Sequence, residues 1–377
     1  METKIRVLFH VPGLGGGGAE RVVVLLANEM VRRGLEVVLL VWNKDGPNLA
    51  MLNPTVRLIS FDSPMDRGGF GKLGTFQNLL RTVRVVYRLR PDAVFSALDF
   101  ANSLIALALF CARSKAAFFP SYHSASALKA EGTAYSIPLL DRLTAARATK
   151  AISVSTGVAR DLVDRGFRRP KVMTIHNPVP AQARQRPEPY PWELELARMG
   201  NGPVIAALGR LVEVKDHATL LEAFHALDRN LDCRLAIFGD GPLEASLREH
   251  ADRLGISGRV LFTGYVNDPG ACYAAADLVV STSRSEGFGN VLVEALAAGL
   301  PIVSTDAPHG PREILADGEF GSLVPVGDAQ AIAKALHLAL ISAKTTERLM
   351  GRARAFSVER IGDQYEALLK DHCQTSA

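Results

Sequence analysis

The stretch LVVSTSRSEGFGNVLVEALAAGLPIVSTD, residues 278–306, combines a strand, a loop, a helix and a second strand. The run Leu278–Thr282 is apolar and β-branched, as is typical of a buried parallel strand. We predict a helix with Asn290 as its N-cap, because Gly299 and the proline beyond it are a strong stop signal. Residues 301–306 form the next strand. This order is typical of one βαβ unit in a parallel sheet.

Two acidic residues lie on either side of the start of this helix. Glu286 is in the loop before it, and Glu294 is in its first turns. The first N–H groups of a helix have no partner within it and carry a partial positive charge, so an anion such as a diphosphate can bind there. The two carboxylates would then accept hydrogen bonds from sugar hydroxyls. Alternatively, Glu294 interacts only with the helix dipole and Glu286 is a solvated loop acid.

The segment from Glu286 to Glu294, two acids with seven residues between them, resembles the signature of retaining glycosyltransferases of family 4. This resemblance implies the α/β fold called GT-B, in which two Rossmann-like, doubly wound parallel-sheet domains face a central cleft. It also implies that Glu286 is a catalytic residue near the donor sugar and that Glu294 holds the ribose hydroxyls of a nucleotide. The residues expected to bind substrate here are Gly287, Phe288, Gly289, Asn290 and Glu294.

Length and composition indicate a globular protein of two domains. The 377 residues are too many for one ordinary core. No apolar run reaches the ~18 residues that span a bilayer, and the N-terminus lacks a signal-peptide pattern. The four cysteines have neither metal-ligand nor redox spacing, so we expect reduced thiols in a cytoplasmic protein.

Charge is distributed unequally along the chain. Residues 1–178 contain 24 Lys+Arg and 13 Asp+Glu, a net charge of +11, whereas the remainder carries −7. A basic half suits an anionic lipid surface, a lipid diphosphate or nucleic acid. Of these partners we expect the anionic membrane surface and a lipid-linked acceptor, and we expect no nucleic acid.

The N-terminal segment contains a glycine-rich loop. The strand Ile5–His10 leads into VPGLGGGGAE and then into an amphipathic helix, which makes half of a doubly wound sheet. The glycines match the dinucleotide-binding pattern only weakly, because no acid closes the second strand. Backbone amides of such a loop can approach an anion closely. The resemblance implies that Gly16 and Gly17 lie near the donor phosphate and the acceptor; alternatively, the loop is a flexible turn.

A histidine follows a later strand of the same half. The strand at residues 116–119 leads to Pro120-Ser121-Tyr122-His123, and a side chain just past the carboxyl end of a strand lies at the ligand-binding edge of a parallel sheet. The resemblance implies that His123 is a catalytic residue that hydrogen-bonds the donor sugar. Alternatively, it is a surface loop residue.

Residues 73–90 are predicted to form a helix with a cationic row. Leu79, Leu80, Val83 and Val86 or Tyr87 give an apolar stripe, and Arg81, Arg84 and Arg88 follow another side. Such a row is usually a solvated face. Our hypothesis is that this face, together with Arg67 and Lys72, contacts an anionic membrane surface peripherally.

Six strands alternate with helical patterns in the second half, which predicts a second parallel sheet. Arg210 and Lys215 follow its first strand, and two cations at a strand end have affinity for a diphosphate. The resemblance implies that both are catalytic and neutralise the leaving nucleoside diphosphate. Alternatively, they are a solvent-exposed pair.

The loop at residues 306–315 resembles that of bacterial members that build lipid-linked or surface glycans, although its Arg312 and Glu313 could equally cap a helix.

The resemblance implies a retaining glycosyltransferase and a UDP-sugar donor. An Asp-x-Asp pair is absent, so we expect an enzyme that needs neither a metal nor a cofactor. Residues 1–178, joined by a C-terminal helix at 356–377, would bind a glycan or lipid-linked acceptor. Residues 179–355 would bind a nucleoside-diphosphate sugar, with UDP as the expected nucleotide. The predicted location is the cytoplasm, at the inner face of the membrane. Two alternatives remain open: an NAD-dependent oxidoreductase using the glycine loop, and a non-enzymatic binder of anionic glycans.

Overall fold

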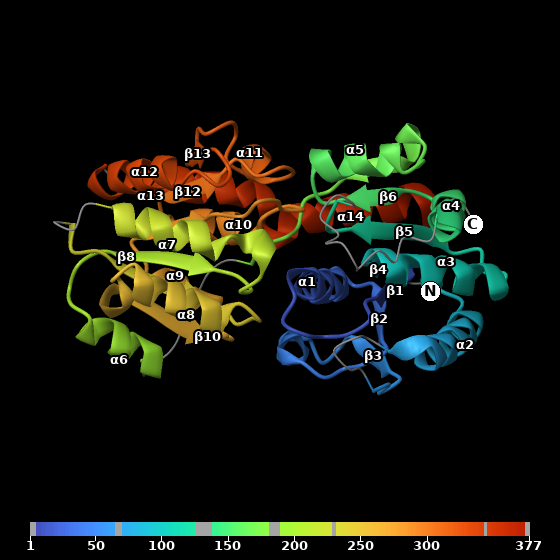
Figure 1. Ribbon diagram of the computed structural model, residues 1–377. Helices are drawn as coiled ribbons and strands as arrows, with labels where there is room; N and C mark the ends of the chain where they lie inside the picture. The colour runs from blue at the N-terminus through green and yellow to red at the C-terminus, as the bar shows by residue number, and fades with distance from the viewer. Residues whose placement is uncertain are drawn as a thin grey trace. The chain divides into compact units, whose positions relative to one another are not determined.

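The computed structural model describes residues 5–64, 70–125, 138–180, 189–227, 231–342 and 345–373. The chain divides into two compact units (Figure 1). The N-terminal unit contains the described residues up to Pro178 and those from Ser357 onward. The C-terminal unit is Val179–Phe356. Each unit contains one parallel sheet.

Seven parallel strands form the sheet of the N-terminal unit. Their spatial order is β3(Arg57–Ser60), β2(Glu36–Val41), β1(Arg6–His10), β4(Ala93–Ala97), β5(Ala117–Tyr122), β6(Ala151–Ser153) and β7(Val172–Thr174). The short strand β3, which is only partly buried, was not predicted because its sequence shows no alternation of apolar and polar residues.

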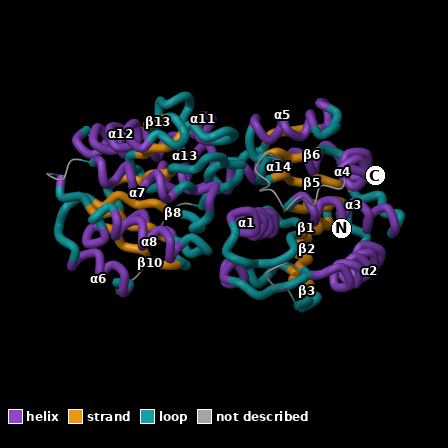
Figure 2. The backbone as a smooth tube through the Cα atoms, viewed as in Figure 1, coloured by secondary structure: helices purple, strands orange, loops and turns teal. Residues whose placement is uncertain are grey.

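Helices cover both faces of this sheet (Figure 2). They are α1(Gly18–Arg32), α2(Gly71–Leu89), α3(Asp99–Cys111), α4(Pro138–Arg147), α5(Thr156–Asp164) and α14(Val358–Cys373). Because successive side chains of a strand point to opposite faces, Val7 and Phe9 of β1 pack in a core with α1 and α14. Leu8 packs in a second core with α2 and α3.

The last helix of the chain belongs to the N-terminal unit, where Figure 1 shows it in red beside β5 and β6. Its Ile361 and Tyr365 lie in the same core as α1. Arg33 of α1 donates from Nη1 to Glu366 Oε2 at 2.5 Å and to Asp363 Oδ1 at 2.9 Å. These ion pairs hold α14 to α1 at the rim of the core.

The C-terminal unit repeats the same strand order with six strands. They are β10(Val260–Gly264), β9(Arg234–Phe238), β8(Val204–Leu208), β11(Leu278–Ser281), β12(Ile302–Thr305) and β13(Ser322–Val324). The helices are α6(Pro191–Arg198), α7(His217–Ala226), α8(Glu244–Arg253), α9(Pro269–Ala274), α10(Asn290–Ala297), α11(Pro311–Ile314), α12(Ala329–Ile341) and α13(Thr346–Ala353). Ile205 and Ala207 of β8 pack with α7, α8 and α12. Val204 and Ala206 pack with α6 and α9.

Helix α2 buries a different face from the one its apolar stripe predicted. Of that stripe, Val86 is fully buried, while Leu80 is 44% exposed and Tyr87 is 63% exposed. The inner face carries the polar residues Asn78 and Thr82 instead, which accept hydrogen bonds from Ser63 Oγ at 2.6 Å and from Trp42 Nε1 at 3.2 Å. Together with Val86 and Leu89, which are buried in the core, they form the inner side of the helix. Arg67, predicted to act with this helix, lies outside the described residues.

Candidate functional site

Both sheets have a topological switch point, where successive crossovers leave toward opposite edges. It lies between β1 and β4 in the N-terminal unit and between β8 and β11 in the C-terminal unit. Ligands of doubly wound sheets bind outside the carboxyl ends of the strands at this point. In the C-terminal unit these ends carry Arg210 and Lys215 after β8, and Glu286 after β11.

The structure brings Lys215 and Glu286 into direct contact. Lys215 Nζ lies 2.5 Å from Glu286 Oε1, and Ser283 Oγ donates to the same oxygen at 2.7 Å. The two charged side chains are 25% and 14% exposed, respectively. An ammonium group has three N–H donors, so Lys215 can bind an anion while it keeps Glu286.

The two loops that carry this pair are bound to each other. Thr282 Oγ1 lies 3.0 Å from the carbonyl oxygens of Lys215 and Asp216 and donates to them. The main-chain N–H of Arg284 donates to Val214 O at 2.8 Å. Arg284 Nε also lies 3.0 Å from Asp216 Oδ2. These contacts fix the main chain on both sides of Lys215, and sequence reasoning missed them because nothing in the spacing pairs the two loops.

Arg210 is next to Gly209, over which the Lys215 side chain runs, and has no ion pair with any described residue. The Lys215 side chain runs over Gly209, where an added Cβ would lie 3.6 Å from Lys215 Cε, and Arg210 is the next residue. Its own side chain is exposed and has no hydrogen-bond or ion-pair partner among the described residues. The loop is fixed by Leu211 N, which donates to Asp240 O at 2.8 Å. The guanidinium of Arg210 is therefore available to an anionic ligand.

The helix after Glu286 begins one residue differently from the prediction. Its N-cap is Gly289, with φ 107° and ψ 57°, and Asn290 is the first helical residue. The prediction of Asn290 as N-cap was wrong because the loop turns through a positive φ, which glycine adopts without steric cost. Phe288 is 2% exposed and its ring packs on Phe356 at 5.7 Å, so a ligand cannot stack on it. Only the main chain of residues 287–289 is left to contact substrate.

The loop after β12 packs against the turn that precedes α10. An added Cβ at Gly310, which has φ 125°, would lie 1.8 Å from Phe288 O, so the two main chains are in van der Waals contact. Glu286 N also donates to Pro308 O at 3.2 Å. Arg312 pairs with Asp306 and Asp317. The loop after β12 thus holds the loop that carries Glu286.

Glu294 lies one turn into α10 and is buried, with 6% exposure. The hydroxyl of Tyr273, on α9, donates to Glu294 Oε2 at 2.8 Å. Sequence reasoning missed Tyr273 because its helix carries no recognisable motif. The alternative interpretation made Glu286 a solvated acid and left Glu294 only the helix dipole as a partner. Glu286 is instead 14% exposed and paired, and Glu294 has a hydrogen bond from Tyr273.

His123 follows β5 directly in the N-terminal unit. Its Nε2 lies 3.1 Å from Ser121 Oγ, and its Nδ1 is buried without a hydrogen-bond partner among the described residues. Burial lowers the pKa of His123 to about 4, and the charge of Asp99 opposes this shift only in part. The imidazole is therefore neutral at physiological pH and can donate or accept one hydrogen bond at each nitrogen.

The glycine loop differs from the free anion-binding loop that was predicted. Gly17 is the N-cap of α1, and its N–H donates to Glu20 Oε2 at 2.8 Å. Burial raises the pKa of Glu20, and the Gly17 amide lowers it in part. Because this amide already has a carboxylate partner, Gly17 does not offer a free N–H to a phosphate. Gly16 is exposed.

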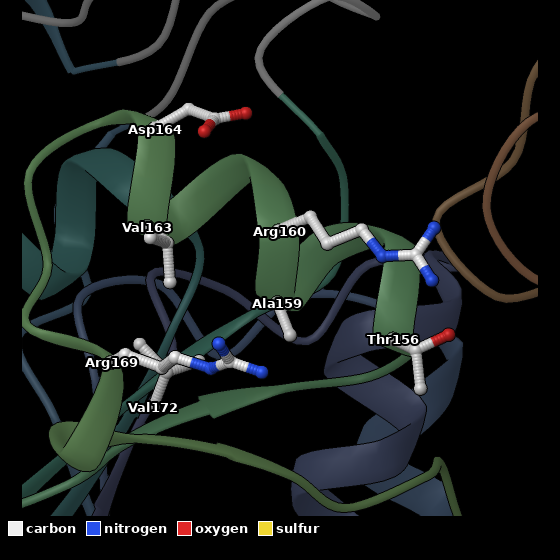
Figure 3. A pocket seen from close by; sticks show the side chains of 7 residues that line it. All are labelled: Thr156, Ala159, Arg160, Val163, Asp164, Arg169 and Val172. Atoms are coloured by element: carbon white, nitrogen blue, oxygen red, sulfur yellow. The ribbon is translucent and has the colours of Figure 1, made fainter.

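A separate pocket lies along α5 and contains none of the predicted site residues. Its lining residues are Thr156, Ala159, Arg160, Val163, Asp164, Arg169 and Val172. In Figure 3 the side chains of Arg160 and Arg169 extend in the same direction, and Asp164 lies at the far end of the helix. Two arginines and one aspartate are thus among its lining residues.

The described part of the chain shows neither a metal-binding cluster nor a membrane-spanning helix. No three His, Cys, Asp or Glu side chains gather there as a metal-binding cluster would. No helix there is long and apolar enough to cross a bilayer.

Comparison with known proteins gives the family. Residues 16–183 match the model for Glycosyltransferase Family 4, and residues 194–356 match the model for Glycosyl transferases group 1. The lipopolysaccharide core biosynthesis glycosyltransferase LpsE of Rhizobium meliloti is 30% identical over 370 residues, which cover 94% of this chain and 96% of LpsE. The chain belongs to glycosyltransferase family 4. A second relative of this glycosyltransferase, LpsD of the same organism, is 27% identical over 93% of this chain and 94% of LpsD.

Solved structures agree on the fold of this family 4 glycosyltransferase. Anabaena Alr3699/HepE, solved in complex with UDP and glucose, has a TM-score of 0.78 at 22% identity and covers 97% of this chain and 100% of its own. WaaG, a glycosyltransferase involved in lipopolysaccharide biosynthesis, has a TM-score of 0.69 at 18% identity over 98% and 100%. The predicted GT-B fold is confirmed. Family membership also favours a transferase over the two alternatives, an oxidoreductase and a non-enzymatic binder.

Proposed function

We propose that this glycosyltransferase moves a sugar from a UDP-sugar to a glycan or lipid-linked acceptor in the synthesis of bacterial lipopolysaccharide or another surface polysaccharide. The observation that carries the proposal is the contact of Lys215 with Glu286 at the switch point between β8 and β11. The names of LpsE and LpsD support the pathway class. The complexes of HepE with UDP and with UDP-glucose support the donor.

The predicted charged residues of the C-terminal unit have roles that their chemistry supports. Lys215, Arg210 and the first amides of α10 bind the diphosphate, because together they supply positive charge at one sheet edge. Glu294 accepts hydrogen bonds from the ribose hydroxyls. Glu286, held by Ser283, faces the donor sugar.

The reaction needs stabilisation of a departing anion. The bond between C1 of the sugar and the diphosphate oxygen breaks, and the acceptor hydroxyl attacks C1 on the same face, which retains the configuration. The hydroxyl proton passes to the oxygen of the departing diphosphate. Lys215 and Arg210 neutralise the charge that develops there, which is the role that a metal ion has in other transferases.

The N-terminal unit provides the acceptor side in this proposal. It contains 26 Lys+Arg and 17 Asp+Glu, a net charge of +9 even with its acidic last helix included. This charge suits a lipid-linked diphosphate at the inner face of the cytoplasmic membrane. Gly16 is the glycine-loop residue proposed to approach substrate, and the neutral His123 hydrogen-bonds the donor sugar.

A screen of nucleotide sugars without acceptor tests the proposal. We expect slow release of UDP from one or a few UDP-sugars, because water can replace the acceptor hydroxyl, and we expect excess EDTA to leave the rate unchanged. GDP- and ADP-sugars are the controls. Release of nucleoside diphosphate from none of the donors would contradict the proposed function, and a rate abolished by EDTA would contradict its metal-independent form.

A further inference from the structure

The pocket along α5, called the α5 pocket below, has no role in the proposed function. Its volume is about 480 Å³, within the range of sites that bind small molecules. It is formed by α5, by the turn at residues 169–171 and by the start of β7, and its apolar lining residues are Ala159, Val163 and Val172. Small-molecule sites usually combine an apolar surface with a few charged groups, so the charged lining residues indicate the ligand.

Two arginines bring unpaired positive charge to the α5 pocket. Arg160 and Arg169 are exposed, and neither has a hydrogen-bond or ion-pair partner among the described residues. Asp164 is four residues after Arg160, a spacing at which opposite charges on a helix can pair. In Figure 3, however, the Arg160 side chain extends away from Asp164 and in the same direction as Arg169. The two guanidinium groups are therefore available to an anionic ligand.

Two neighbouring lysines, in contrast, are bonded within the protein. Lys171 Nζ donates to Ala148 O at 2.7 Å, and Lys150 Nζ donates to Pro170 O at 2.8 Å. Because Pro170 and Lys171 belong to the turn at residues 169–171, both bonds hold that turn in place. The main chain at Arg169 is thus fixed, while its side chain stays unpaired.

Helix α5 is held to two other helices. Arg165, at its C-terminal end, is 10% exposed and lies 2.8 Å from Asp99 Oδ1 of α3 and 3.2 Å from Asp141 Oδ2 of α4. At the other end of α5, Val158 N donates to Ser155 Oγ at 3.2 Å. The wall of the pocket that α5 forms is therefore rigid, which lowers the entropic cost of binding a ligand there.

The chemistry of the α5 pocket suits a phosphorylated sugar. Guanidinium groups bind phosphate through paired, charge-assisted hydrogen bonds, and two of them match a dianion. The apolar lining residues can contact the C–H face of a sugar ring, and the carboxylate of Asp164 can accept hydrogen bonds from ring hydroxyls. A nucleobase usually stacks on an aromatic side chain, and the described lining residues include none.

The α5 pocket begins at the sheet edge that carries His123. Thr156 follows β6 and His123 follows β5, and these strands are neighbours, with Tyr122 beside Ser153. Parallel strands have their carboxyl ends at one edge of the sheet, where ligands bind. A glycan bound at this edge can therefore reach the pocket with a further sugar.

We propose that the α5 pocket binds the phosphate monoester of a sugar, with Arg160 and Arg169 on the phosphate and Asp164 on the sugar hydroxyls. The inference rests on the proposed function in one respect: the source of this ligand is a phosphorylated sugar of the acceptor glycan, other than the sugar that is glycosylated. The residues proposed to bind the donor diphosphate, Lys215 and Arg210, belong to the other unit.

Calorimetric titration of the full-length protein with glucose 6-phosphate tests this inference. We expect Arg160→Ala and Arg169→Ala each to raise the Kd by ~10-fold, because each removes a charge-assisted contact with the phosphate. Arg168→Ala is the matched control, since Arg168 is the preceding exposed arginine and does not line the pocket. It should bind glucose 6-phosphate like the wild type. Inorganic phosphate should bind more weakly than glucose 6-phosphate, because it lacks the sugar.

Four results would overturn the proposal: no binding of glucose 6-phosphate by the wild type, equal Kd values for the Arg168→Ala and Arg169→Ala variants, equal Kd values for inorganic phosphate and glucose 6-phosphate, or binding that Arg210→Ala abolishes and Arg169→Ala leaves intact. The last result would place the phosphate in the donor site. Acceptor-free UDP release by the wild type tests the proposed function separately. Its failure would contradict that function and leave the Kd values for glucose 6-phosphate unchanged.

Discussion

Replacement of Lys215 by alanine is expected to lower turnover by ~10²- to 10³-fold, the usual effect of losing one preorganised group that stabilises a developing anion. The ammonium group is fixed in advance, because Glu286 holds it at 2.5 Å and Thr282 holds the main chain behind it. A fixed cation stabilises the departing diphosphate without reorganising during the reaction. Initial rates of UDP release under saturating donor measure the effect.

The Lys215→Ala variant should stay folded, since the lysine is part-exposed and Ser283 still donates to Glu286 after the change. Lys334→Ala is the matched control, because Lys334 is an exposed lysine of the same unit on α12. We expect the control to have wild-type turnover. A Lys215→Ala variant that turns over at nearly the wild-type rate would refute the role assigned to this residue.

Replacement of Gly310 by alanine is expected to destabilise the C-terminal unit by about 2–4 kcal/mol, in the upper range for single substitutions. The new Cβ would lie 1.8 Å from Phe288 O, and φ of 125° is unfavourable for any residue with a side chain. Because a carbonyl cannot move aside like a flexible side chain, the main chain at Phe288 must shift, and with it the neighbouring Glu286 loop. We expect turnover to fall even in the molecules that remain folded.

Gly255→Ala is the control that separates the backbone strain of a positive φ from the steric clash of a new Cβ. Gly255 has φ of 67°, but an added Cβ there meets no atom within 4 Å. It should cost about 1 kcal/mol, the left-handed penalty alone, and leave turnover unchanged. Urea unfolding of both variants gives the two free energies of unfolding. Equal losses of stability would show that the contact between Gly310 and Phe288 contributes nothing.

The sequence was most informative about strands and strand ends. The six strands predicted in the second half correspond to the six described strands of the C-terminal sheet, because buried parallel strands are short apolar runs with clear breaks. The same logic placed Lys215 and Glu286 at one sheet edge before their contact was known. Neighbouring parallel strands have their carboxyl ends at the same edge of the sheet. Residues that follow two such strands, as Lys215 follows β8 and Glu286 follows β11, therefore lie close together.

The contacts between loops were beyond sequence reasoning. Ser283 on Glu286 and Tyr273 on Glu294 depend on the path of a loop and on the packing of a short helix, which no local pattern encodes. The Gly17 amide was predicted free because glycine loops bind anions, but Glu20 of the same chain occupies it. A carboxylate of the chain can occupy an N–H group at a helix start that would otherwise bind a ligand anion, and the sequence alone does not show whether it does.

The face of α2 was misassigned for a related reason. An apolar stripe normally marks the buried side of a helix, and Leu80 and Tyr87 follow that spacing. Val86 and Leu89, with the hydrogen-bonded Asn78 and Thr82, form the buried side instead, so that Leu80 and Tyr87 face outward. An apolar stripe left on the surface is then itself informative, since it indicates a binding surface.

A crystal structure of the protein with UDP tests most directly whether one diphosphate site is built from the strand ends of the C-terminal unit. We predict that the diphosphate oxygens lie within hydrogen-bonding distance of Lys215 Nζ and the Arg210 guanidinium. We also predict that the ribose hydroxyls donate to the carboxylate of Glu294. UDP bound away from the carboxyl ends of β8 and β11, with Lys215 still paired only to Glu286, would contradict the assignment.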